Sequence, residues 1–391
     1  MRAIAITLVS LTLAGVLDAG LSAAQVPPAS ARPAAAQGAP GAWQRAAANP
    51  ILKPSQIPAR AGALYPMVGD PSLMFDDGRF KMWFGYGGLD DVKDERRVRV
   101  RTAYAESTDG LSWSMIVAPS LDVGAGWDLT NAETPSVLKD PSLPAGHPRK
   151  YRMYYSGLDR AIEQAPFEQV IRAGMGYGIG LAFSPDGRRF SRLPAGESPH
   201  GAAGLVLRPN PPVVDRDAWD FIHVADPHVL LHNGVYHLWY TSFAREHRTN
   251  RTYLTVGYAT SPDGIRWTKH GHVIKPDQAW ESARSEPHVG RPNVLWTGAR
   301  FEMFYDAVDA GSAGRPGELS AGVGHAWSTD GKNWSKGSAP IFVTNNGRGE
   351  RAGMMIGAAV LLMDGTYRIV YGGYDPDEHH TVFNLATAPA R

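Results

Sequence analysis

The chain has 391 residues, and its 39 Lys and Arg against 38 Asp and Glu give a formal net charge of +1. This balance provides no basic surface for a nucleic acid or an anionic membrane, so it favours uncharged partners. The 43% of hydrophobic residues can fill a core, the 43 Gly and 30 Pro predict many turns, and the absence of Cys excludes disulfides.

The N-terminus has the order of a secretory signal peptide. Arg2 is followed by a mostly apolar run up to Leu17 and then by the small residues Ser22, Ala23 and Ala24. Residues 25–41 are rich in Ala, Pro, Gln and Gly, which predicts a flexible leader. We therefore expect export to the periplasm or the medium, removal of residues 1–24 and one folded domain over residues 42–391. A buried N-terminal helix is the alternative.

No later segment reaches the about 18 uninterrupted apolar residues of a membrane-spanning helix. The mature protein is therefore expected to be soluble, without a membrane partner.

Five copies of one pattern recur along the chain, each a Pro-led or apolar strand, a short turn and an aromatic strand. Turns such as Asp76-Asp77-Gly78 suit tight hairpins, because Gly and Asn adopt left-handed backbone conformations readily. The paired segments are Asp70–Phe75 with Phe80–Tyr86, Thr134–Leu138 with Tyr151–Tyr155, Asp226–Leu231 with Tyr236–Tyr240, Arg291–Trp296 with Phe301–Tyr305, and Gly357–Leu362 with Tyr367–Tyr371.

Four of these repeats continue into a third strand that ends in a Ser-x-Asp-Gly turn and an aromatic residue. These segments are Tyr104–Trp113, Leu181–Phe190, Tyr258–Trp267 and His325–Trp334. The fifth repeat ends after its third strand, Asn384–Pro389, so Trp43–Lys53 is expected to supply its fourth. The pattern predicts an all-β, five-bladed β-propeller with four antiparallel strands per blade and the last blade closed by the N-terminal strand. An open β-sandwich is the alternative.

In a propeller the first strand of each blade lines the central channel. The residues that open these strands are therefore expected to form a ring, which reads Asp70, Thr134, Asp226, Arg291 and Gly357. Two carboxylates in one channel suit acid and base chemistry on a glycosidic bond. Arg291 can bind a sugar hydroxyl or change the pKa of a carboxylate.

The ring, the Asp-Pro opening of the first repeat and the Ser-x-Asp-Gly-x-x-Trp endings resemble the five-bladed glycoside hydrolases of families 43, 32, 68, 117 and 130. The resemblance covers residues 43–391. In families 43 and 32 acidic residues open the inner strands of the first three blades, as base or nucleophile, as modulating Asp and as general acid. The resemblance implies Asp70 as base or nucleophile and Asp226, in place of the usual Glu, as acid. Glu286, in an insertion before the fourth repeat together with His288, is the alternative acid.

The second repeat departs from the family pattern. It carries Thr134 at the matched position and Glu133 one residue earlier, and a one-residue shift turns a side chain to the other face of a strand. Both are taken as candidate substrate-binding residues. His223 and His228, which flank Asp226, are candidates for contacts with a sugar or a metal, or are histidines with a purely structural role.

The sequence therefore predicts a monomeric, exported glycoside hydrolase that acts on a plant or microbial polysaccharide or oligosaccharide. No cofactor is required, although Asp and His in the channel can hold a structural Ca²⁺. One alternative is a family-130-like phosphorylase, with Arg291 and Arg284 or Arg351 around the phosphate. The other is a non-catalytic carbohydrate-binding propeller, which the missing acid of the second repeat favours.

Overall fold

The computed structural model describes residues 40–58, 64–89, 98–163, 169, 173–210, 219–221, 223–246, 251–281, 289–307, 322–343, 350, 355–375 and 380–390. Over these ranges the chain is built from β-strands, with one turn of α-helix, α1 (Arg160–Glu163), and two 3₁₀ turns, η1 (Pro54–Gln56) and η3 (Ala279–Glu281). The predicted all-β class is confirmed. No helix in this part of the chain is long and apolar enough to cross a membrane.

The described strands pair in antiparallel runs that follow the sequence repeats. Repeat 1 consists of β2 (Leu64–Asp76), β3 (Arg79–Leu89), β4 (Val98–Ser107) and β5 (Ser114–Leu121). Repeat 2 consists of β6 (Asn131–Lys139), β7 (Tyr151–Leu158) and β8 (Tyr177–Ser184), with the short β9 (Ser191–Arg192) and β10 (Leu205–Leu207) both paired to β8. One parallel bridge, between Val100 and Asn131, joins these two repeats into one sheet.

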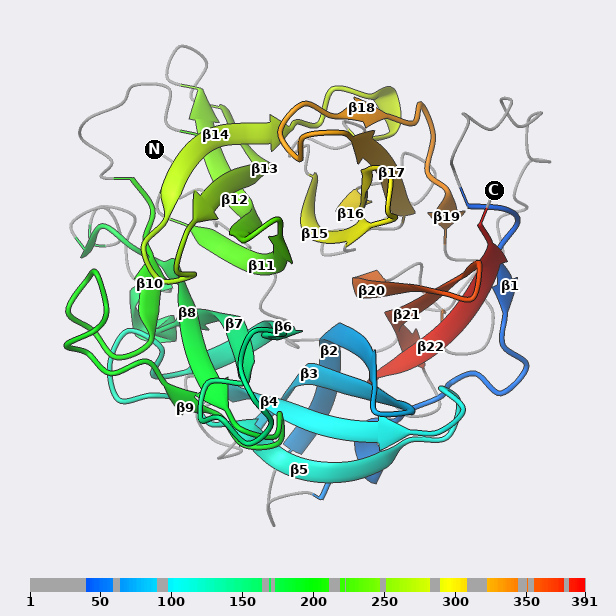
Figure 1. The fold of residues 1–391 in the computed structure, drawn as a ribbon, viewed down its shortest axis with the longest axis horizontal. Coiled ribbons are helices and arrows are strands. Elements are labelled where there is room, and N and C mark those ends of the chain that lie inside the picture. Colours follow the sequence, from blue (N-terminus) through cyan, green and yellow to red (C-terminus); the bar gives the residue numbers. More distant parts are fainter. Residues whose placement is uncertain are drawn as a thin grey trace, which may run out of the picture.

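Repeats 3 to 5 have the same order. Repeat 3 consists of β11 (Val224–His232), β12 (Val235–Glu246), β13 (Arg251–Ser261) and β14 (Thr268–Ile274). Repeat 4 consists of β15 (Val289–Trp296), β16 (Phe301–Ala307) and β17 (Gly322–Ser328), with β18 (Ser335–Lys336) and β19 (Phe342–Val343) both paired to β17. Repeat 5 consists of β20 (Met355–Met363), β21 (Thr366–Asp375), β22 (His380–Pro389) and β1 (Gln44–Arg45). The first strands of the repeats, β2, β6, β11, β15 and β20, lie around the middle of the molecule, and the later strands lie outward (Figure 1).

The N-terminal segment packs on the last strand of the chain. Arg45 pairs with Ala386 of β22, and Leu52 forms a bridge with Phe383. The Asn49 side chain donates from Nδ2 to Leu385 O at 3.0 Å and accepts from Leu385 N–H at 2.8 Å. Packing begins before Trp43, because Pro40 and Gly41, assigned to the leader in the sequence analysis, are buried and Gly41 N–H donates to Pro389 O.

A buried ion pair recurs at the outer strand of repeats 2 to 5. A Lys or Arg of the outer strand forms an ion pair with a buried carboxylate that precedes the first strand of the same repeat: Arg192 with Asp128, Lys269 with Asp220, Lys336 with Glu281, and Arg45 with Glu350. Each base stands opposite an Ala of the third strand, Ala182, Ala259, Ala326 or Ala386. The N-terminal strand therefore supplies the basic residue of this ion pair in repeat 5, as the fourth strand does in repeats 2 to 4.

Candidate functional site

The five residues of the predicted ring lie within the first strands, which begin two to six residues earlier, and they share one unusual backbone conformation. Their φ angles are positive: 51° at Asp70, 48° at Thr134, 49° at Asp226, 47° at Arg291 and 63° at Gly357. Each lies where the pairing of the first and second strands shifts register. A positive φ is uncommon outside glycine and is an outlier for a β-branched residue, at a cost on the order of 1–3 kcal/mol each. Strain of this kind clusters at functional sites.

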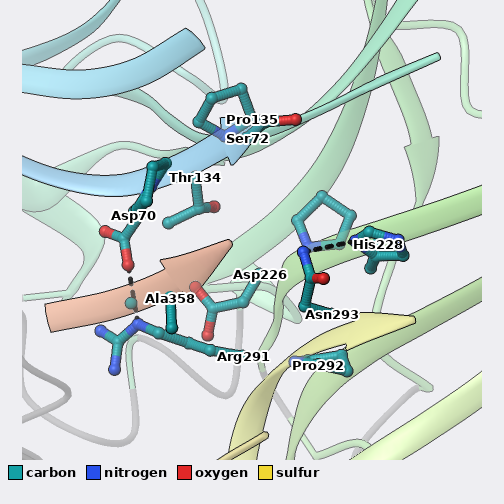
Figure 2. A pocket seen from close by; sticks show the side chains of 13 residues that line it. Asp70, Ser72, Thr134, Pro135, Asp226, His228, Arg291, Pro292, Asn293 and Ala358 are labelled. Atoms are coloured by element: carbon teal, nitrogen blue, oxygen red, sulfur yellow. Dashed lines mark hydrogen bonds and ion pairs between the residues drawn. The ribbon is translucent and has the colours of Figure 1, made fainter. Parts of the chain in front are cut away.

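All five of these positions line one pocket between the first strands (Figure 2). The remaining lining residues follow them in sequence: Pro71, Ser72, Pro135, Pro227, His228, Pro292, Asn293 and Ala358. The predicted ring thus corresponds to one common cavity, to which each repeat contributes one strand opening.

Asp70 and Arg291 form the ion pair of this pocket, although they lie 221 positions apart in sequence. Arg291 Nε donates to Asp70 Oδ1 at 2.8 Å, and the side chain of Asp70 is 17% exposed. In Figure 2 the carboxylate of Asp226 lies beside Arg291 as well. Arg291 is therefore the positive charge between the two predicted catalytic carboxylates.

Burial and neighbouring charges shift the pKa values of Asp70 and Arg291. Burial raises the pKa of Asp70, Arg291 opposes this shift, and the neighbouring Asp226 adds to it. For Arg291 burial acts to lower the pKa, but the carboxylates of Asp70, Asp226 and Asp306 outweigh it and the pKa is raised. Arg291 is therefore a permanent cation, while Asp70 is a stronger base than an ordinary aspartate.

Hydroxyl groups of the second strands hold the backbone of the ring. Asp226 N–H donates to Ser156 Oγ at 2.8 Å, and Arg291 N–H donates to Thr241 Oγ1 at 2.8 Å. Ser156 Oγ also contacts the hydroxyl of Thr134 closely. In the two bonds to a backbone N–H the hydroxyl comes from the preceding repeat, whereas Ser156 and Thr134 both belong to repeat 2. Ser156 and Thr241 were not predicted, although the sequence carries a signal for them: each is a hydroxyl residue directly after the last Tyr of the aromatic strand.

Gly357 completes the ring because no side chain fits there. A Cβ at this position would lie 2.6 Å from Asp70 Oδ1 and 2.8 Å from Asp70 Cα. The fifth repeat therefore contributes free space that allows Asp70 to occupy its position.

We expect Gly357→Ala to lower the turnover of any substrate processed in this pocket, because the added methyl group displaces Asp70. Gly365→Ala is the matched control: Gly365 lies in the same repeat at φ 66° with no atom within 4 Å of an added Cβ. It carries the same kind of backbone strain, on the order of 1–3 kcal/mol, without the contact. Steady-state rates and melting temperatures of both variants check this, and equal rates would contradict it.

Of the two histidines, the structure brings only His228 to the pocket. His228 Nε2 hydrogen-bonds Val294 O at 2.9 Å, and burial lowers its pKa to about 4, so the ring is neutral. His223 is not among the lining residues. Its Nδ1 accepts from Tyr177 N–H at 3.0 Å, and burial lowers its pKa to about 3. Both histidines have structural partners within the fold.

Glu133 is not among the residues that line the pocket. Its Oε1 accepts hydrogen bonds from Asn131 Nδ2 at 2.9 Å and from Tyr177 OH at 3.0 Å. Glu286 and His288 lie outside the described residues, as do Arg284 and Arg351. Within the described ranges no group of three or more His, Asp or Glu is placed to hold a metal ion, and the predicted Ca²⁺ remains a prediction.

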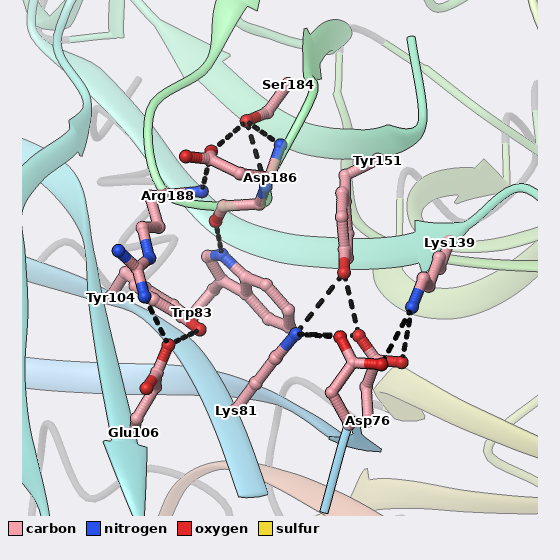
Figure 3. Close-up of polar contacts among 12 residues, drawn as sticks. Asp76, Lys81, Trp83, Tyr104, Glu106, Lys139, Tyr151, Ser184, Asp186 and Arg188 are labelled. Atoms are coloured by element: carbon pink, nitrogen blue, oxygen red, sulfur yellow. Dashed lines mark hydrogen bonds and ion pairs between the residues drawn. The ribbon is translucent and has the colours of Figure 1, made fainter. Parts of the chain in front are cut away.

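The Ser-x-Asp-Gly turns join neighbouring repeats rather than contributing to the pocket. In repeats 2 to 4 the carbonyl of the turn glycine accepts from an aromatic side chain of the preceding repeat: Trp83 Nε1 donates to Gly187 O at 2.7 Å, Tyr154 OH to Gly264 O at 2.8 Å, and Trp239 Nε1 to Gly331 O at 2.9 Å. Figure 3 shows Trp83 beside the turn that contains Ser184 and Asp186. These tryptophans therefore pack between repeats.

A second polar cluster lies at the far end of β2 from Asp70 (Figure 3). Asp76 accepts from Lys81 Nζ at 2.6 Å, Lys139 Nζ at 2.6 Å and Tyr151 OH at 2.7 Å. Burial acts to raise the pKa of Asp76, but these three donors lower it overall. The cluster is a satisfied ion-pair network that links repeats 1 and 2.

Comparisons with known proteins show which solved structures have a similar fold. No protein-family model matches the sequence, and no curated protein matches it. The structure is similar to a β-1,2-mannobiose phosphorylase from Listeria innocua in complex with β-1,2-mannobiose, with a TM-score of 0.63 and 14% identity over 89% of this chain and 96% of that one. It is also similar to a glycosyl hydrolase from Bacteroides ovatus, with a TM-score of 0.61 and 13% identity over 90% and 97%.

A thermostable family-43 glycoside hydrolase has a TM-score of 0.56 and 16% identity over 83% of this chain and 91% of that one. At such identities the likeness establishes the fold. The predicted resemblance to the propeller glycoside hydrolases is therefore confirmed at the level of the fold.

Proposed function

We propose that this chain is a carbohydrate-active enzyme that hydrolyses a glycosidic bond in the pocket between its first strands. The observation that carries the proposal is the placement of two carboxylates, Asp70 of β2 and Asp226 of β11, at strained backbone positions in one pocket with Arg291. Glycoside hydrolysis uses such a pair: one carboxylic acid protonates the leaving oxygen, and one carboxylate activates water or attacks the anomeric carbon.

The surroundings of Asp70 favour the role of base or nucleophile. Its bond to Arg291 orients one oxygen, and the guanidinium stabilises the ionised form, which a base or nucleophile requires. Asp226 then provides the acid, and Glu286 remains the alternative acid. The proton passes from the acid to the glycosidic oxygen, and the base accepts the proton of the attacking water or bonds the sugar directly.

Hydrolysis fits the pocket charge better than phosphorolysis, the reaction of the Listeria neighbour. Among the described lining residues Arg291 is the cation, and it is already paired with Asp70, next to Asp226. A phosphate ion at this place would meet two carboxylates and one neutralised guanidinium.

A panel of arabinans, xylans, fructans, mannosides and agaro-oligosaccharides tests the function. We expect release of reducing sugar at a rate that does not depend on inorganic phosphate. Formation of a sugar phosphate would establish the phosphorylase instead. Binding measured by calorimetry without turnover would establish a carbohydrate-binding propeller and refute the enzyme.

We further propose that the five strand runs are the blades of a closed propeller and that the protein acts as an exported monomer. The pairing of β1 with β22 supports closure. Residues 1–39 lie outside the described part of the chain, so export rests on the sequence pattern, and the intact mass of the mature protein tests the cleavage after about residue 24.

A further inference from the structure

A third carboxylate approaches Arg291 from a second strand. Asp306 of β16 stands opposite Gly290, the residue before Arg291, and its exposed fraction is 1%. Ser156 and Thr241 occupy the equivalent positions of repeats 2 and 3, opposite Glu133 and Ala225. Where those repeats carry a hydroxyl, repeat 4 carries a buried charge.

Arg291 connects this charge to Asp70. Asp306 Oδ2 lies 3.8 Å from Arg291 Nη1, while Arg291 Nε donates to Asp70 Oδ1 at 2.8 Å. One guanidinium therefore neutralises carboxylates from repeats 1 and 4. A charge shared in this way stabilises each partner less than an exclusive pair would.

We propose that Asp306 is a positioning residue that shares the Arg291 guanidinium with Asp70 and so weakens the stabilisation that Arg291 gives to the ionised Asp70. The catalytic consequence rests on the proposed function: an Asp70 that is less stabilised as an anion is a stronger base. Asp306 would then supply the modulating charge that the second repeat lacks, because that repeat presents the uncharged Thr134.

The charged groups involved are few among the described residues. Arg291 faces Asp70, Asp226 and Asp306, and Asp70 faces Arg291 and Asp226. Removing the charge of Asp306 leaves one fewer carboxylate competing for Arg291 and one fewer negative charge near Asp70. Both effects favour the ionised form of Asp70, so its pKa is expected to fall.

Asp306→Ser is the test variant, because the fold already accepts Ser156 at the equivalent position. Glu302→Gln is the matched control, since Glu302 is a buried carboxylate of the same strand that bonds Arg300 and Tyr367. With Asp70 as the base, we expect the acidic limb of the kcat/KM profile to move down by on the order of one pH unit in Asp306→Ser and to stay in place in Glu302→Gln. An equal loss of rate at every pH, with no shift of the limb, would overturn the proposal.

A second readout does not depend on turnover. Because the pKa of Asp70 is raised in the folded state, its ionisation lowers stability as pH rises, and Asp70→Asn removes that loss. At pH 7 we expect Asp70→Asn to raise the melting temperature more in the wild-type background than in Asp306→Ser. An equal change of melting temperature in both backgrounds would overturn the proposal, even if no glycoside is cleaved. If Asp306→Ser does not fold, Asp306→Asn is used in its place.

Discussion

Asp70→Asn and Asp226→Asn are each expected to reduce turnover by a factor of about 10² to 10⁴, the usual effect of removing a general acid or base, while the protein stays folded. Asn keeps the shape of the side chain and can still accept the hydrogen bond from Arg291 Nε, but it neither donates a catalytic proton nor accepts one at neutral pH. Initial rates on a substrate that the native protein cleaves, together with circular dichroism, measure both parts of this result.

Asp77→Asn is the control for the first of these variants. The substitution removes the same charge in the turn after β2, where the side chain of Asp77 is 72% exposed. The φ angle of Asp77 is 53°, a conformation that Asn also tolerates. This variant should retain the native rate. Native turnover in Asp70→Asn would refute the proposed site, whether or not Asp226→Asn loses activity.

Removal of residues 40–54 is expected to abolish cooperative folding at 25 °C, whereas a chain that begins at residue 40 should fold as the full chain does. The truncation removes the buried Ile51 and Leu52, where the loss of a large apolar side chain costs about 2–5 kcal/mol each. It also leaves Glu350 buried without Arg45, which costs about 3–5 kcal/mol. The sum reaches the whole stability of a typical domain, about 5–15 kcal/mol.

Urea unfolding followed by circular dichroism checks the truncation. Arg45→Met keeps the N-terminal strand but removes the partner of Glu350, so it should still unfold cooperatively, at a lower midpoint than the chain that begins at residue 40. Equal midpoints for the chains that begin at residues 40 and 55 would mean that the N-terminal segment does not stabilise repeat 5.

The repeats could be predicted from the sequence because their determinants are local. Apolar and aromatic strands, Asp-Gly turns and Ser-x-Asp-Gly endings act over a few residues, and their spacing places Asp70, Thr134, Asp226, Arg291 and Gly357 at equivalent positions. A Trp-Asp pair also repeats in the sequence, since Trp127-Asp128 and Trp219-Asp220 stand at the same distance before Thr134 and Asp226. The sequence does not show that Asp128 and Asp220 form buried ion pairs, because their partners Arg192 and Lys269 lie 64 and 49 positions away.

The charges and partners of the site were decided by the tertiary structure. The partner of Arg291 is Asp70, 221 positions away, because the first strands of distant repeats meet in the middle of the fold. Asp306 reaches Arg291 from the neighbouring strand, and His228 bonds Val294 O, 66 positions away, in the next repeat. The sequence by itself determined the five equivalent positions of the ring. The left-handed backbone at these positions and the pairing of their charges depend on contacts between repeats, which no local pattern encodes.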